Sequence, residues 1–211
     1  MSPASASAQT RRSPKWEARR AEIVDTSARV FAQRGYHATG IAELCEVNGL
    51  GKGAFYHYIE SKEDLLAAIN ERVVDAVMAG ADAVTAAGGS PTEQLRGLGS
   101  ALLDVIDRFP DHVWVFLHEV VALTDERADR YRERRRVYER RVEDVLRAGI
   151  DSGELRELDP RLTSLAWLGM HNYTYLWLRA GGRTTPHDVA DLWADIFLHG
   201  IAAPPPGDRP T

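Results

Sequence analysis

The chain has 211 residues, a formal net charge of −5, 44% hydrophobic residues and one cysteine, Cys45. A chain of this length buries a full hydrophobic core, and a single cysteine excludes an internal disulfide and any cysteine-based zinc site. No apolar run approaches the ~18 residues of a membrane span, and the N-terminus lacks the apolar core of a signal peptide, so we expect a cytoplasmic protein without a membrane partner.

The first helix is predicted from Lys15 to Arg34. Its apolar stripe consists of Trp16, Ile23, Ser27, Val30 and Phe31. Gly35 follows as a C-terminal cap, with Tyr36 placed to pack back on the helix. The residues before the helix, 1–14, are small, polar and marked by proline, which predicts a disordered tail.

A second, short helix is indicated by Ile41, Leu44 and Cys45, which are spaced i, i+3 and i+4. This spacing gives the helix one buried side, with Cys45 as a small core residue. Asn48 and Gly49 break the helix, since both residue types tolerate the left-handed backbone of a tight exit.

A third helix is predicted from about Lys52, after Leu50 as the single apolar residue of the turn. Phe55 and Ile59 face inward at i and i+4. Two short helices around a glycine turn form a helix-turn-helix pattern, whose second helix enters the major groove of DNA.

At these residues the sequence resembles a known family. The run GLGKGAFYHYIESKEDLL, preceded by FAQRGYHAT, is similar to the TetR-family pattern GVSKGTLYHYFKSKEELL, and the similarity is strong over residues 18–69. Three hydroxyl residues of the pattern are absent here: Gly51 replaces the usual serine cap of the recognition helix, Ala54 a threonine or serine, and Gly40 a threonine.

The resemblance implies a DNA-binding surface. Lys52, Gly53 and Ala54 are expected at base edges, and Tyr56, His57 and Lys62 at phosphates. Thr39 is expected to cap the first motif helix beside Gly40 and to touch phosphate through its hydroxyl or backbone. The implied DNA-binding residues are therefore Thr39, Gly40, Lys52, Gly53, Ala54, Tyr56, His57 and Lys62.

The charge distribution agrees with this surface. The first 62 residues hold nine Lys or Arg against six Asp or Glu, a net charge of +3, so the rest of the chain carries −8. Arg11, Arg12 and Lys15 have two interpretations: a solvated tail, or a basic arm that follows the DNA backbone or minor groove.

The remaining sequence predicts an all-α second domain. Ser61 and Asp64 open a helix to about residue 86; further helices are expected over residues 91–109, 111–123, 125–151, 160–179 and from the capping box at Thr185. The helix over 111–123 is apolar on nearly all sides and is predicted to be buried. The predicted organisation is a disordered tail (1–14), a three-helix helix-turn-helix domain (15–61), a helical ligand-binding and dimerisation domain (62–203) and a second disordered tail (204–211).

The last two helices hold more aromatic surface than one small bundle buries. The resemblance implies that they form a four-helix interface with a second copy of the chain, which makes a homodimer. The candidate interface residues are Leu165, Leu168, Trp177, Trp193 and Phe197.

A ligand site is indicated in the same domain. The segment HNYTYLWLR, residues 171–179, resembles a TetR subgroup that senses acyl-CoA thioesters and has the pattern NWTYRWYRPDGR. An acyl chain needs an apolar cleft, and a CoA head needs arginines. The candidate ligand-binding residues are Trp114, Leu117, Tyr138, Trp167, His171, Tyr175 and Arg179. The arginine-rich helix over 125–151 is either a solvated face with i, i+4 ion pairs or an anion-binding wall.

Two other functions stay open from the sequence. A repressor of an efflux system that senses hydrophobic drugs would use the same aromatic residues without the arginines. A DNA-architectural protein would not need the large second domain.

An enzyme is not expected. The run Gly49–Gly53 lacks the spacing of a phosphate loop, and Ala122 stands where a zinc protease motif starting at His118 needs a second histidine. The sequence therefore indicates a DNA-binding regulator, most simply a repressor released by a small effector, with no cofactor and no metal.

Overall fold

The computed structural model describes residues 13–119, 122–179 and 181–201, and every regular element within these ranges is a helix. The predicted all-α fold is confirmed. The elements are α1 (Pro14–Arg34), α2 (Ile41–Val47), α3 (Lys52–Tyr58), α4 (Lys62–Ala87), α5 (Pro91–Arg108), α6 (Pro110–His118), α7 (Asp125–Asp151), α8 (Pro160–Asn172), the 3₁₀ turn η2 (Tyr173–Leu176) and α9 (Pro186–Ile201).

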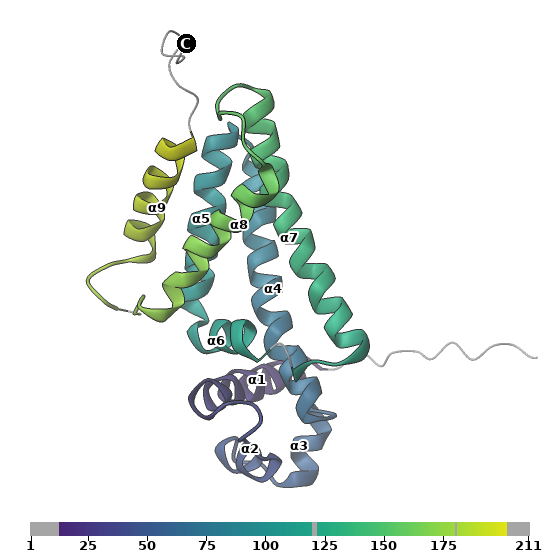
Figure 1. Ribbon diagram of the computed structural model, residues 1–211. Coiled ribbons are helices and arrows are strands. Elements are labelled where there is room, and N and C mark those ends of the chain that lie inside the picture. The colour runs from purple at the N-terminus through teal and green to yellow at the C-terminus, as the bar shows by residue number, and fades with distance from the viewer. Residues whose placement is uncertain (1–12, 120–121, 180, 202–211) are drawn as a thin grey trace, which may run out of the picture.

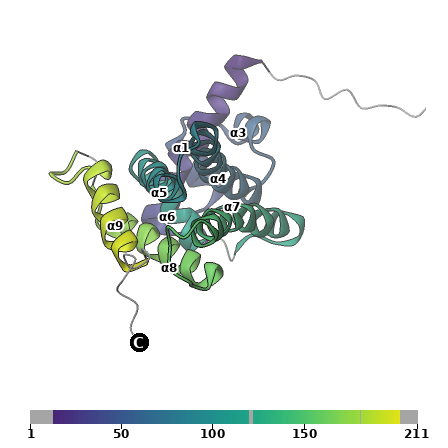
Figure 2. The same cartoon turned by 90° about the horizontal axis from the view of Figure 1, so that it is seen from above.

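Figure 1 shows α1, α2 and α3 gathered at one end of the molecule, with the longer helices extending away from them. The short helix α6 lies across the junction and packs on both α1 and α4. Seen along the bundle in Figure 2, α8 and α9 lie on one side of the molecule. In the part of the chain described, no helix is both long and apolar enough to cross a membrane.

Capping residues fix most helix starts. The Ser61 hydroxyl accepts from the Asp64 N–H at 2.9 Å, while the Asp64 carboxylate accepts from the Glu60 N–H rather than from Ser61. Ser90 and Glu93 form a complete capping box before α5. These caps satisfy N–H groups that have no partner inside the helix.

Helix α1 begins one residue earlier than predicted. Ser13 caps α1 by accepting from the Trp16 N–H, and Pro14 occupies the first helical position. Lys15 therefore belongs to a helix and not to a disordered arm. The rest of the expected arm, including Arg11 and Arg12, and the expected tail over 204–211 lie outside the described residues.

Two hydrophobic clusters form the core, and α4 belongs to both. Leu65, Leu66 and Ile69, in its first turns, pack with α1, α2 and α3. Val73 and Ala81, further along, pack with α5, α7, α8 and α9. The boundary expected at residues 61/62 thus falls at the start of a helix that both halves of the molecule share.

Two helices end earlier than predicted. α6 stops at His118, where the Glu119 carboxylate accepts from the Tyr36 N–H of the neighbouring unit at 3.0 Å. α8 stops at Asn172, where the Thr174 hydroxyl donates to the His171 carbonyl at 2.7 Å. At the end of α8 the Thr174 side chain thus competes for a carbonyl that would continue the helix, whereas Glu119 after α6 contacts the residues that follow α1.

Candidate DNA-binding surface and ligand cavity

The turn between α2 and α3 is fixed by hydrogen bonds as well as by glycine. Gly49 has a φ of 62°, as predicted for the exit. Asn48 stays in the right-handed region, which differs from the expectation that it shares the left-handed backbone. Its buried amide donates to the Leu44 carbonyl at 2.8 Å and to the Ser27 hydroxyl at 3.3 Å, so it ties the turn to α1.

Helix α3 presents one face outward because the other is fully buried. Phe55 and Ile59 have no exposed surface. Lys52, Gly53 and Ala54 in its first turn are exposed. Tyr56 and His57, further along α3, are exposed as well. The structure brings these five predicted DNA-binding residues together on one short helix at the end of the molecule (Figure 1).

Thr39 is placed differently from the prediction. Gly40 is the N-cap of α2, without a side-chain cap hydrogen bond. The Thr39 side chain is buried, and its hydroxyl donates to the Gly35 carbonyl at 2.9 Å. The predicted capping role is wrong, because this hydroxyl holds the end of α1 instead.

Lys62 lies at the start of α4 against an aromatic ring. Its Nζ is 4.2 Å from the centre of the Tyr36 ring, a cation–π contact. Burial lowers the pKa of Lys62, and the nearby Glu119 carboxylate opposes this effect. The contact with Tyr36 holds the Lys62 ammonium group beside the helix-turn-helix.

The second domain contains an apolar cavity between α4, α5, α6, α7 and α8. Its volume is about 70 Å³. It is lined by Val73, Val74, Val77, Met78, Leu102, Val105, Ile106, Val113, Phe116, Leu117, Arg134, Arg135, Tyr138, Glu139, Leu168 and Asn172. Leu117 and Tyr138 are therefore at the cavity, as the sequence predicted, and burial raises the pKa of Tyr138.

The other five predicted ligand residues lie elsewhere. Trp167 and His171 are buried in the core, with ring centres 4.1 Å apart. Trp114 and Tyr175 meet at His118, outside the cavity lining. Arg179 is exposed. Seven of the sixteen lining residues are apolar residues of α4 and α5. No sequence signal separates such residues from those of the ordinary core.

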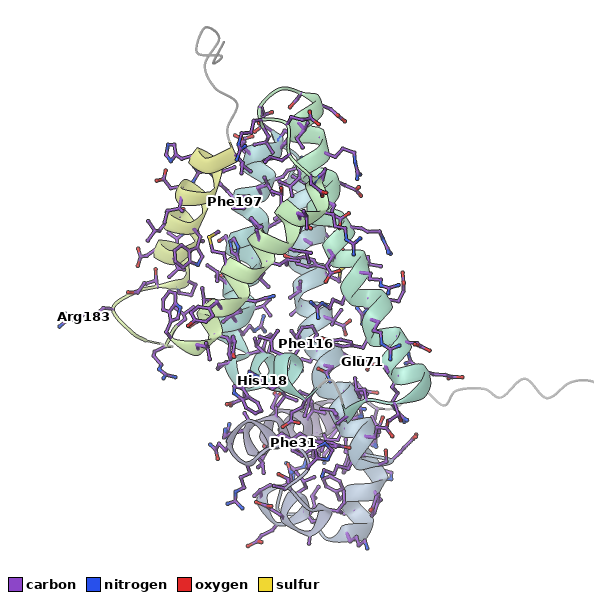
Figure 3. The ribbon with its side chains drawn as sticks, in the orientation of Figure 1. Phe31, Glu71, Phe116, His118, Arg183 and Phe197 are labelled. Carbon is purple, nitrogen blue, oxygen red and sulfur yellow. The ribbon has the colours of Figure 1, made fainter. Side chains whose placement is uncertain are left out.

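The His118 cluster joins α6 to η2. The His118 Nδ1 lies 2.9 Å from the Trp114 carbonyl, and its Nε2 lies 3.0 Å from the Tyr175 hydroxyl. A carbonyl only accepts, so Nδ1 carries a proton, and in the neutral ring Nε2 accepts from the Tyr175 hydroxyl. The cluster is a polar link between two elements; Figure 3 shows His118 at the lower edge of the bundle.

Among the described residues, four arginines of α7 pair with acidic residues of α4, and four others pair within α7. Arg134 lies 2.6 Å from Asp75, and Arg130 lies 3.6 Å from Glu71. Arg141 hydrogen-bonds Asp82. The i, i+4 pattern expected from the sequence occurs at Arg135 and Glu139. Cross-helix pairing was not visible in the sequence because it depends on the register of α4 against α7.

An apolar face covers the outer side of α8, η2 and α9. Of the predicted interface residues, Leu165 and Trp177 are exposed, at 44% and 40%. Leu168 is buried and lines the cavity, so it does not belong to this exposed face. Trp193 and Phe197 are partly buried against the core. The structure adds Leu162, Tyr173, Leu176, Leu192 and Ile196, which are all exposed.

Comparison with known proteins identifies the family. The profile "Bacterial regulatory proteins, tetR family" matches residues 23–69, and "Tetracyclin repressor-like, C-terminal domain" matches residues 88–201. The chain belongs to the TetR family. It is therefore grouped with helix-turn-helix transcriptional regulators, which bind DNA through their N-terminal domain.

Three relatives are informative. The transcriptional repressor KstR2 of Mycobacterium tuberculosis is 29% identical over 188 residues, covering 87% of this chain and 92% of the relative. The structure of that ketosteroid regulator aligns with a TM-score of 0.83 at 27% identity, over 88% of this chain and 96% of KstR2. The structure of AibR in complex with isovaleryl coenzyme A and operator DNA aligns with a TM-score of 0.77 at 28% identity, over 84% of this chain and 97% of AibR. The transcriptional activator FasR of Mycolicibacterium smegmatis is 30% identical over 105 residues, covering 50% of this chain and 48% of FasR.

Proposed function

We propose that this regulator is a homodimeric repressor that leaves a palindromic operator when an acyl-CoA binds its second domain. The observation that carries the proposal is the apolar cavity, whose lining includes both α4 and α6. Both helices pack on α1 of the DNA-binding domain. A ligand in the cavity therefore presses on the elements that hold the helix-turn-helix.

The DNA contacts proposed for α3 follow from its exposed face. Lys52, Gly53 and Ala54 would approach base edges in the major groove, and readout would rest on Lys52 and on contacts to thymine methyl groups. Tyr56, His57 and Lys62 would hold phosphates and set the register of the helix. Gly40, exposed at the start of α2, would let the backbone approach phosphate.

A dimer is proposed because one short recognition helix reads only a few base pairs. Two protomers related by a twofold axis read two half-sites, and the half-site spacing follows from the dimer geometry. The exposed apolar face of α8, η2 and α9 lies on one side of the molecule and away from α3 (Figure 2). This face is the surface proposed to pair with its copy.

The effector class is supported by the cavity and by two relatives. AibR is described with isovaleryl coenzyme A, and KstR2 is a ketosteroid regulator. An acyl chain fits the apolar lining. However, a cavity of about 70 Å³ holds only a few water molecules, so the helices must separate for a ligand to enter. That separation is the proposed source of differential affinity for two states.

The link to DNA runs through two polar contacts of α6. His112 Nε2 lies 3.0 Å from the Asp25 carboxylate of α1, and Arg72 of α4 lies 3.0 Å from the same carboxylate. Glu119 accepts from the Tyr36 N–H at the end of α1. Because Val113, Phe116 and Leu117 of α6 line the cavity, moving them displaces these contacts.

The experiment begins with selection of an operator from random double-stranded DNA. Release of that operator is then measured by fluorescence anisotropy against acyl-CoAs of several chain lengths, the matching free acids, and planar hydrophobic drugs. We expect release by CoA thioesters. Release by drugs or free acids without release by any thioester would favour an efflux repressor and would refute the acyl-CoA proposal.

A further inference from the structure

A second space adjoins the apolar cavity, where α4 and α7 run toward the DNA-binding domain. We name it the outer cleft; its volume is about 450 Å³. It is lined by Asp64, Ala67, Asn70, Glu71, Val74, Leu123, Thr124, Glu126, Arg127, Arg130, Tyr131 and Arg134. Figure 3 shows Glu71 on α4 beside α7, and Phe116 nearby at the base of the bundle.

The outer cleft and the apolar cavity share a boundary. Val74 and Arg134 line both spaces. Phe116 lines the cavity and Tyr131 lines the cleft, and their ring centres are 5.1 Å apart. A movement of these two rings and of the flexible Arg134 side chain would therefore join the spaces into one channel.

The cleft contains a buried acceptor without a donor. Asn70 is 3% exposed, and its amide N–H₂ donates to the Leu66 carbonyl at 2.9 Å. Its Oδ1 is buried and has no hydrogen-bond partner among the described residues. A buried polar atom in this state is costly to leave unpaired, so it favours a ligand that brings an N–H or O–H donor.

The cleft also contains guanidinium donors that are loosely paired. Arg127 lies 3.9 Å from Glu63, and Arg130 lies 3.6 Å from Glu71. Both distances exceed that of a hydrogen bond, 2.7–3.2 Å, whereas Arg134 is bound to Asp75 at 2.6 Å. The carboxylates of Asp64, Glu71 and Glu126 balance the three arginines. Recognition of an anion here thus comes from directed donors and not from net charge.

We propose that the outer cleft binds the polar head of the effector, while the apolar cavity takes its tail. This inference rests on the proposed function and specifies its site. The head carries an anionic group for Arg127 and Arg130 and an N–H or O–H donor for Asn70. A phosphate-bearing head with amide groups, such as that of coenzyme A, has both. The head lies at the junction with the DNA-binding domain, because Leu123 and Tyr131 of the cleft wall also belong to the N-terminal hydrophobic cluster.

The test measures binding to the full chain by titration calorimetry, with decanoyl-CoA, decanoate and free coenzyme A as probes. Exchanging both cleft arginines (Arg127→Ala with Arg130→Ala) removes charge-assisted hydrogen bonds, so decanoyl-CoA affinity falls about tenfold or more, while decanoate affinity stays within about twofold. The matched control exchanges Arg132 and Arg136 for alanine; both are exposed on the opposite face of α7 and line neither space. The control keeps wild-type affinity for all three probes.

Asn70→Leu supplies an independent readout. It removes the unpaired oxygen, so thermal stability does not fall, but decanoyl-CoA binding weakens. If the Arg127/Arg130 variant binds decanoyl-CoA as tightly as wild type does, the outer cleft does not bind the head. The proposal that the effector is an acyl-CoA then still stands. Loss of thioester affinity only on Arg179→Ala places the head after η2, outside the outer cleft, and also overturns the head-site proposal. If no thioester binds the wild-type protein, the effector class and the head site fail together.

Discussion

His171 offers a quantitative test of the core of the second domain. The sequence made it a ligand candidate, but the structure places it between α8 and α5 with 1% of its surface exposed. Its Nδ1 lies 2.8 Å from the Trp167 carbonyl, and only a glycine at position 99 leaves room for its Nε2. Burial lowers the pKa of His171 to about 4, and the hydrogen bond to Trp167 opposes this shift.

The sign of the pH effect follows from this pKa. In the unfolded chain the pKa of a histidine is about 6.5, so the unfolded state takes up a proton first as the pH falls. The stabilisation is present above pH ~6.5 and is lost progressively toward pH ~4. Proton linkage at this one site lowers the free energy of unfolding by about 1.8 kcal/mol per protomer between pH 7 and pH 5, and by about 3.4 kcal/mol in the acid limit.

The perturbation is His171→Asn. The asparagine amide can still donate to the Trp167 carbonyl but does not titrate. The variant is less stable at pH 7, because the smaller side chain leaves a cavity, yet it loses less stability on acidification. Urea unfolding at pH 7 and pH 5, at one fixed protomer concentration, measures both effects.

The controls isolate the buried ring. His112, whose pKa is also lowered chiefly by burial, is present in both proteins and cancels in the difference. His187→Asn, made at an exposed histidine, is the control for the substitution itself. If wild type and His171→Asn lose the same stability between pH 7 and pH 5, the argument that His171 is buried and neutral is refuted.

Further substitutions test the DNA-binding surface and the dimer. Gly53→Ala adds a Cβ that meets no atom within 4 Å, so helix stability rises by up to ~1 kcal/mol. Operator affinity falls, because the added methyl group keeps the backbone of α3 from approaching the bases. Unchanged operator affinity would exclude such a close approach. Lys62→Ala weakens binding to all DNA sequences and reduces the slope of log affinity against log salt by about one; an unchanged slope removes Lys62 from the phosphate contacts. Ile196 is 52% exposed, and Ile196→Asp yields monomers that no longer bind the operator. Light scattering measures the oligomeric state. This variant tests the interface more directly than Trp193→Asp, because Trp193 also packs on the core and its loss would affect folding. A variant that remains dimeric at micromolar concentration would place the interface elsewhere.

The helix-turn-helix was predictable because its signals are local. The i, i+3, i+4 spacing of α2, the glycine exit and the inward pair Phe55 and Ile59 act within a few residues of one another. The errors arose where a side chain makes a hydrogen bond that the residue pattern does not reveal. Asn48 stays right-handed because it binds Ser27 on α1, and Thr39 is not a cap because its hydroxyl binds Gly35.

The ligand site was less predictable for a related reason. Trp167 and Tyr138 have similar aromatic character in the sequence, yet only Tyr138 borders the cavity. Which apolar residues surround a void and which fill the core depends on how five helices pack. The same holds for the ends of α6 and α8, since the apolar run continues past His118 but the chain turns there to place Leu123 in the N-terminal cluster.

The shared helix α4 sets the scale of the proposed switch. Its 26 residues span about 39 Å at 1.5 Å per residue. A tilt of about 5° around its middle shifts the attached motif by roughly 2 Å, a large error for hydrogen bonds of 2.7–3.2 Å to DNA. A symmetric dimer makes this error at both half-sites at once. The effector and the operator favour different tilts of α4, so each weakens the binding of the other. By thermodynamic linkage, bound operator lowers effector affinity by the same factor by which bound effector lowers operator affinity.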